Sequence, residues 1–97
     1  MSTETIKREL EKNKSEIRKR FQVKEIGLFG SYVRNEQTKQ SDLDVLVDFA
    51  KPIGWDVVEL HEYLRKLLGV KVDLVLKQGI KRNKKLWKLV KQEVIYV

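Results

Sequence analysis

The sequence predicts an α/β fold, a small mixed β-sheet with helices packed mainly on one face. Two observations predict this fold class. Short segments in which apolar and polar residues alternate, as in strands, lie between longer segments with apolar residues at helical spacing. The chain has 97 residues, 41% of them hydrophobic, which suffices for a single domain, residues 1–97, around one modest core.

The composition narrows the classes of function. A formal net charge of +7 favours an anionic partner, namely a nucleotide, a nucleic acid or an acidic protein. The 36% of charged residues is equally typical of thermophile proteins. The chain has no cysteine, which excludes disulfides and thiolate metal sites. No apolar run approaches the roughly 18 residues of a membrane span, and no hydrophobic signal region opens the chain, so we expect a cytoplasmic protein.

Residues 3–20 are predicted to form the first helix. Apolar residues recur there at helical spacing, at Ile6, Leu10, Ile17 and Phe21. Asn13 and Lys14 interrupt the stripe, and Ser2 or Thr3 is the expected N-cap. The basic far end of this helix is interpreted as a solvated face or as a rim that binds phosphate.

Residues 24–29 are predicted to form the first strand, which Gly30 ends, and residues 31–36 a helical turn. Gly30 lets backbone approach a ligand closely. Ser31 stands where a helix begins, and its free N–H groups suit a phosphate. Arg34 lies three residues further on the same face, where it reaches a phosphate or an acid of the Asp42/Asp44 pair; alternatively it caps the loop.

Residues 42–49 are predicted to form the second strand. Asp42 and Asp44 then share one face, roughly 6–7 Å apart. Two such carboxylates favour a cation between them. Asp48 shares this face further along and is expected to meet solvent or a basic side chain. Ser41, before the acids, either bonds a carboxylate or holds the turn.

Residues 70–76 are predicted to form the third strand, in which Asp73 is an acid among apolar residues. We expect Asp73 to be buried, and an isolated buried carboxylate costs several kcal/mol. A metal shared with Asp42 and Asp44 removes this cost; a salt bridge to Lys71 is the alternative. Phosphoryl or nucleotidyl transfer commonly uses such metal-binding acids opposite a phosphate cradle.

The remaining segments are two helices and a strand. Residues 55–68 form a helix whose wide apolar stripe comprises Val57, Val58, Leu60, Leu64, Leu67 and Leu68, and Gly69 is its C-cap. His61 on that helix is interpreted as structural. Residues 81–92 form a basic helix with Leu86, Leu89 and Val90 inward and Trp87 among lysines. Residues 93–97 form a terminal strand, whose open edge would invite pairing into a homo-oligomer or hetero-oligomer.

The pattern Gly-Ser-x-x-Arg, then Ser-Asp-x-Asp before an apolar strand, resembles the nucleotidyltransferase superfamily of the DNA polymerase beta type. The residues that match are Gly30, Ser31, Arg34, Ser41, Asp42 and Asp44. The small size and Asp73 in Val-Asp-Leu-Val point to the minimal nucleotidyltransferase (MNT) branch, and the resemblance covers about residues 25–76. Two positions depart from the family: Val33 replaces a small residue, and Asn35 replaces a glycine, although Asn tolerates a left-handed turn.

The resemblance implies a function. Gly30, Ser31, Arg34 and Ser41 would bind the nucleotide, and Asp42, Asp44 and Asp73 would be catalytic and bind Mg²⁺, as two ions. ATP would be the substrate, and AMP would pass to a hydroxyl, that of a tyrosine, on a partner protein. Proteins of this branch act as antitoxins beside a HEPN-type toxin, which would be the partner.

Two other functions stay open. One is a catalytically weak binding module that neutralises a partner by direct contact, through Trp87, residues 93–97 or the basic helix. The other is a small nucleic-acid binder, whose binding would fall steeply with salt. The three acids argue against both, because a protein that only binds anions gains nothing from them.

Overall fold

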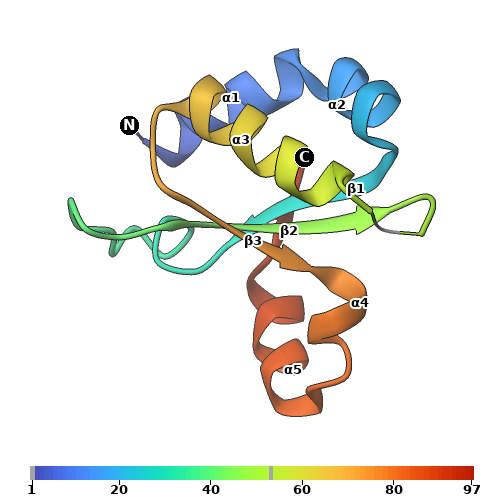
Figure 1. The fold of residues 1–97 in the computed structure, drawn as a ribbon. Coiled ribbons are helices and arrows are strands. Elements are labelled where there is room, and N and C mark those ends of the chain that lie inside the picture. The colour runs from blue at the N-terminus through green and yellow to red at the C-terminus, as the bar shows by residue number, and fades with distance from the viewer. Residues whose placement is uncertain (1, 53) are drawn as a thin grey trace.

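The computed structural model describes residues 2–52 and 54–97, and its centre is a four-stranded sheet in the order β3-β2-β1-β4 (Figure 1). The strands are β1 (Val23–Phe29), β2 (Leu43–Phe49), β3 (Val72–Leu76) and β4 (Ile95–Tyr96). β1 pairs antiparallel with β2 and β4, whereas β2 pairs parallel with β3. The small mixed sheet of an α/β fold is therefore confirmed.

Helices cover both faces of this sheet (Figure 1). α1 (Thr3–Lys12), α2 (Lys14–Phe21) and α3 (Asp56–Leu68) lie on one face, and α4 (Lys77–Ile80) and α5 (Lys84–Glu93) lie on the other. The larger hydrophobic core joins the sheet to the first group. A smaller cluster of Leu46, Ile80 and Val90 joins the sheet to α4 and α5. The protein therefore has two hydrophobic cores where one was expected.

The first predicted helix is divided at Asn13, the residue that interrupts its apolar stripe. Asn13 has φ −106° and ψ 8°, and its amide Nδ2 donates to the Glu9 carbonyl at 2.8 Å. The bend lets the buried residues Leu10 and Ile17 both reach the core. Ser2 is the N-cap, since its Oγ accepts a hydrogen bond from the Thr5 N–H at 3.2 Å.

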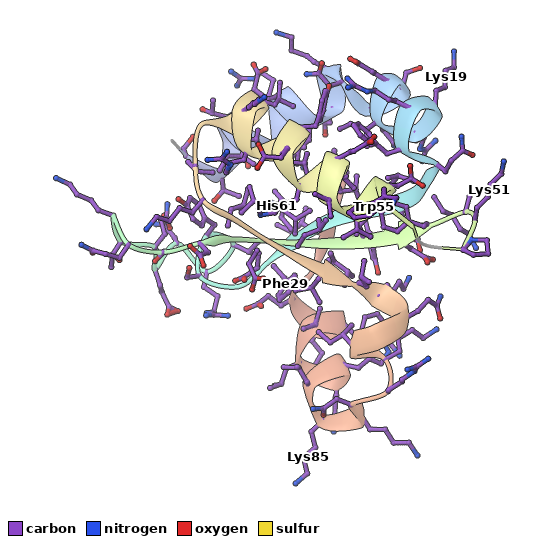
Figure 2. The ribbon with its side chains drawn as sticks, in the orientation of Figure 1. Lys19, Phe29, Lys51, Trp55, His61 and Lys85 are labelled. Carbon is purple, nitrogen blue, oxygen red and sulfur yellow. The ribbon has the colours of Figure 1, made fainter. Side chains whose placement is uncertain are left out.

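α3 begins one residue later than expected, after an exposed Trp55, and ends at Gly69 with φ 67°. The stripe is narrower than predicted, because Val58 is 54% exposed while Leu60 and Leu64 are buried. His61 lies between α3 and the sheet, where its Nε2–H donates to the Val72 carbonyl at 2.7 Å (Figure 2). Its structural role is confirmed.

α5 begins at Lys84, where the Asn83 Oδ1 accepts from the Leu86 N–H at 3.1 Å. Leu86 and Leu89 were expected to be inward but are 45% and 65% exposed, which makes that expectation wrong. The smaller hydrophobic cluster has room for only one of the three inward-facing residues predicted on α5, which is Val90. Trp87 is half-buried beside it. No helix within residues 2–52 and 54–97 is long and apolar enough to cross a membrane.

Candidate active site

Gly30 ends β1 and brings the chain against the second strand. Its φ is 81°, which favours glycine. A Cβ on Gly30 would lie 2.0 Å from Oδ2 of Asp44, so a side chain here would displace that carboxylate. The group that lies close to Gly30 is the Asp44 side chain, and the expected close approach of a ligand stays a prediction.

Asp44 and Asp73 come together across two parallel strands. They are register partners between β2 and β3, as Phe29 and Asp44 are between β1 and β2. Asp73 is exposed, so the expectation of a buried carboxylate is wrong, and within the described residues no ion pair joins it to Lys71. A shared cation is therefore supported by the proximity of Asp73 to Asp44 and not by burial of Asp73.

The pKa of Asp44 reflects both its burial and the acids near it. Burial raises the pKa of Asp44 to about 6, and repulsion from Asp73 and Asp42 adds to the effect, while Arg34 opposes it. Asp42 is exposed and immediately precedes β2 rather than lying within it. Its charge still acts on Asp44, so the three acids form one electrostatic group around Asp44.

This group fits a hard divalent cation. Carboxylate oxygens are the ligands that Mg²⁺ prefers, and one or two of them suffice when phosphates and water complete the octahedron. Asp44 next to Asp73 supplies such oxygens, and a cation would relieve the repulsion from Asp73 and Asp42 that adds to the effect of burial on the pKa of Asp44. In the two described stretches, three side chains do not converge into a closed metal cage.

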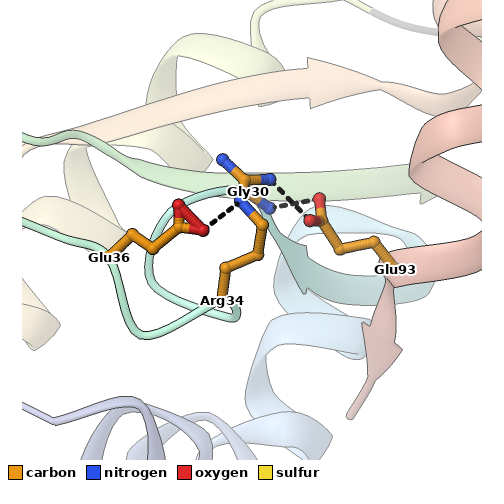
Figure 3. Close-up of polar contacts among 4 residues, drawn as sticks. All are labelled: Gly30, Arg34, Glu36 and Glu93. Atoms are coloured by element: carbon orange, nitrogen blue, oxygen red, sulfur yellow. Dashed lines mark hydrogen bonds and ion pairs between the residues drawn. The ribbon is translucent and has the colours of Figure 1, made fainter.

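Arg34 lies beside the acids on the turn that follows Gly30. The turn spans residues 31–35, and Asn35 has φ 60°, so the expected left-handed conformation is confirmed. The Arg34 Nη1 donates to Oε1 of Glu93 at 2.5 Å, and its Nε donates to Oε1 of Glu36 at 3.2 Å (Figure 3). Among the described contacts Arg34 bonds two glutamates and neither Asp42 nor Asp44, so its expected contact with that pair is wrong, and its contact with a phosphate stays a prediction.

Glu93 is the site residue that the sequence did not single out. Besides Arg34, it contacts the main chain of the turn, since its Oε2 accepts the Gly30 N–H at 2.8 Å (Figure 3). The sequence interpretation put residue 93 at the start of a strand, whereas Glu93 ends α5. The sequence pattern did not mark Glu93 as a site residue, because its partner Arg34 lies 59 positions earlier and no local motif connects the two residues.

Two other predicted polar residues have structural contacts. The Ser41 Oγ accepts the Thr38 N–H at 2.9 Å, so Ser41 holds the loop, one of the roles left open for it. Asp48 is buried, at 7% exposure, and its Oδ1 accepts from the Gln78 amide at 3.4 Å. The expectation that Asp48 meets solvent or a basic side chain is wrong, because α4, a helix that the sequence does not predict, covers it.

A pocket of about 530 Å³ opens beside the acids on the α5 side of the sheet. Asp44 and Asp73 lie at its wall, and Figure 2 shows Phe29 on the same side of the sheet. The other residues that line it are mainly apolar and include Val75, Ile80 and Leu86. The acids thus border an apolar space large enough for a ring.

Gly30 and the turn of residues 31–35 are called the glycine turn below. A glycine turn that faces clustered acids on a small mixed sheet defines a class of proteins that transfer nucleotidyl groups. Residues 10–97 match the nucleotidyltransferase domain family, and the chain belongs to this family. The minimal nucleotidyltransferase expected from the sequence motifs is thereby confirmed.

Individual relatives agree with this membership. The chain is 48% identical over 98 residues to the protein adenylyltransferase MntA of Thermococcus cleftensis, a match that covers 100% of this chain and 97% of that protein. A solved structure described as a minimal nucleotidyltransferase superposes with a TM-score of 0.81 at 34% identity, over 98% of this chain and 95% of the other. A toxin–antitoxin structure with AMP-PNP superposes with a TM-score of 0.69 at 26% identity, over 89% and 70%.

Proposed function

We propose that the protein transfers AMP from ATP to a tyrosine hydroxyl of a partner protein, with Mg²⁺, as two ions, bound by Asp42, Asp44 and Asp73. The observation that carries the proposal is the placement of Asp44 between Gly30 and Asp73. Relatives named protein adenylyltransferases support the same chemistry. Bound metal would neutralise phosphate charge and lower the pKa of the attacking hydroxyl.

The layout of the site separates the two ends of the reaction. Gly30, Ser31 and Arg34 lie at the end of β1, where they would hold the outer phosphates. Phosphoryl transfer places the attacking and leaving oxygens in line. The acceptor hydroxyl would therefore approach from the Asp73 side, along the apolar pocket, which suits the ring of a tyrosine. Asp73 would take the proton of the hydroxyl, whose oxygen then bonds to the α-phosphorus. The bond from the α-phosphorus to the bridging oxygen breaks, and pyrophosphate leaves with that oxygen.

The partner we propose is a HEPN-type toxin, with this protein as its antitoxin in the cytoplasm, where ATP is available. The toxin–antitoxin structure with AMP-PNP supports a pairing of this kind. Leu86 and Leu89, exposed on α5, offer apolar contact area next to the pocket. A binding module that neutralises its partner by this contact alone is the second candidate.

The test is transfer of label from ATP to protein in an extract of source cells with Mg²⁺. We expect label to reach a protein from α-labelled but not γ-labelled ATP, since AMP keeps the α-phosphate. Asp42→Asn/Asp44→Asn should remove transfer while its circular dichroism stays native. Asp56→Asn is the matched control, because it removes the same kind of charge from the first turn of α3, on the face of the sheet opposite α4 and α5. This variant should transfer AMP normally.

The outcomes separate the two candidates. Undiminished transfer by the double variant would contradict the assignment of the acids. An unlabelled partner that the double variant still inhibits would favour the binding module. Label from γ-labelled ATP would indicate phosphorylation and would contradict AMP transfer.

A further inference from the structure

Glu93 holds two parts of the glycine turn with one carboxylate. Its Oε2 accepts the Gly30 N–H at 2.8 Å, and its Oε1 accepts from the Arg34 guanidinium at 2.5 Å (Figure 3). The Glu93 side chain is 21% exposed, against 49% for Arg34. A charge-assisted pair of this geometry belongs to the stronger class of hydrogen bonds, so it fixes both partners.

The hydrogen bond from the Gly30 N–H to Glu93 replaces a backbone hydrogen bond that β4 does not supply to Gly30. β4 pairs with β1 through Gly27 and Leu28 and no further, so within the described residues no carbonyl of β4 faces the Gly30 N–H. The Glu93 carboxylate takes the place of that carbonyl. Because the other side of Gly30 adjoins the Asp44 carboxylate, Glu93 fixes the peptide against which Asp44 lies.

The contact to Arg34 selects one orientation of a long side chain. Hydrogen bonding to Glu93 raises the pKa of Arg34, and its Coulombic attraction adds to the effect. Glu36, on the same loop, also accepts a hydrogen bond from Arg34. Nη1 and Nε are occupied by these acids, and in the described contacts Nη2 remains open to a ligand.

We propose that Glu93 is a positioning residue for nucleotide, which holds Gly30 and Arg34 where the outer phosphates of MgATP bind. This inference rests on the proposed function, because it assigns the nucleotide to the same turn. A carboxylate repels phosphate and so acts here through its two partners. The same contacts would fit a placeholder that leaves when phosphate arrives, and the two roles have opposite effects on affinity.

The test compares Glu93→Gln with Glu62→Gln, which removes a carboxylate paired with Arg65 on α3, away from the turn. We expect the Kd for MgATP, measured by calorimetry, to rise about tenfold in Glu93→Gln, the loss typical of one charged hydrogen bond. The KM for ATP should rise by the same factor while the KM for the acceptor protein is unchanged. Glu62→Gln should bind MgATP as the wild type does.

A double-variant cycle with Arg34→Gln shows whether Glu93 acts through Arg34. If it does, adding Glu93→Gln to Arg34→Gln should raise the Kd by less than it does in the wild type. An unchanged Kd, or equal increases in both KM values, would mean a merely structural role and would overturn the inference. Tighter binding by Glu93→Gln would identify a placeholder and would overturn it as well. A wild type that binds no MgATP would contradict the proposed function itself, and the inference with it.

Discussion

Asp44 shows how neighbours set the chemistry of a single residue. Burial, with repulsion from Asp73, holds the pKa of Asp44 at about 6. A carboxyl group with a raised pKa binds its proton more tightly in the folded protein than in the unfolded chain. In the absence of metal, its contribution to stability is therefore fullest below about pH 3.8 and is lost as the pH rises to about 6.

Asp44→Asn tests this effect, because the amide has nearly the same size and no charge. We expect the metal-free variant to be more stable than the wild type at neutral pH by on the order of 1 kcal/mol, since solvent screens a half-buried group. This corresponds to a melting temperature roughly 4–8 °C higher. The gain should vanish at the acid end of the titration range, and Mg²⁺ should stabilise the wild type alone. Thermal melts across this pH range in EDTA provide the measurement. A variant less stable than the wild type at neutral pH would contradict the destabilising effect of the Asp44 charge.

At the scale of residues, the sequence predicted what strand alternation and motif spacing control. Gly30, Asp44 and Asp73 were expected at one site, and the strand register brings them together. Glu93 was missed because its contacts to Gly30 and Arg34 span 63 and 59 residues and depend on where α5 ends. Such a contact leaves no periodicity in the sequence.

At the scale of elements, apolar spacing located the strands and α3 but misjudged the inner face of α5. Periodicity says which residues share a helix face, whereas burial also depends on what lies opposite. The partner surface of α5 is a small cluster around Leu46 and Ile80, so Val90 is buried and Leu89 is not. α4 was missed because its four residues are too few to show a helical pattern.

The two neighbours on α5 therefore differ in their effect on stability. Val90 is 2% exposed, so Val90→Ala should destabilise the protein by about 1–2 kcal/mol through lost burial and a residual cavity. Leu89 is 65% exposed, and Leu89→Ala should change stability by less than about 0.5 kcal/mol. Urea denaturation measures both. Equal losses in the two variants would mean that α5 packs with both side chains, as its periodicity suggests.

At the scale of the whole molecule, the C-terminal segment joins the two layers. Val94 packs with the smaller cluster, Val97 packs with the larger core, and the segment between them pairs with β1 at the sheet edge. In Figure 1 the chain passes from α5 to the layer of α1 and α3 in this way. Because Glu93 directly precedes this segment, the position of the segment also sets the Glu93 contact with the glycine turn.

Gly27 is what allows the segment to approach so closely. A Cβ there would lie 2.7 Å from Cγ2 of Val94, 3.1 Å from Cδ1 of Tyr96 and 3.2 Å from the Ile95 carbonyl. We expect Gly27→Ala to destabilise the protein by about 1–3 kcal/mol, the usual effect of overpacking. Amide exchange at Val97, whose N–H donates to the Ile26 carbonyl at 2.9 Å, should become faster.

Gly79→Ala on α4 is the matched control, because a Cβ there meets nothing within 4 Å. The control should be at least as stable as the wild type, since alanine favours a helix over glycine by up to about 1 kcal/mol. If β4 anchors the turn through Glu93, Gly27→Ala should also weaken binding of MgATP. Native stability and native exchange at Val97 in Gly27→Ala would mean that β4 adapts freely, and the two layers would then be joined by their cores alone.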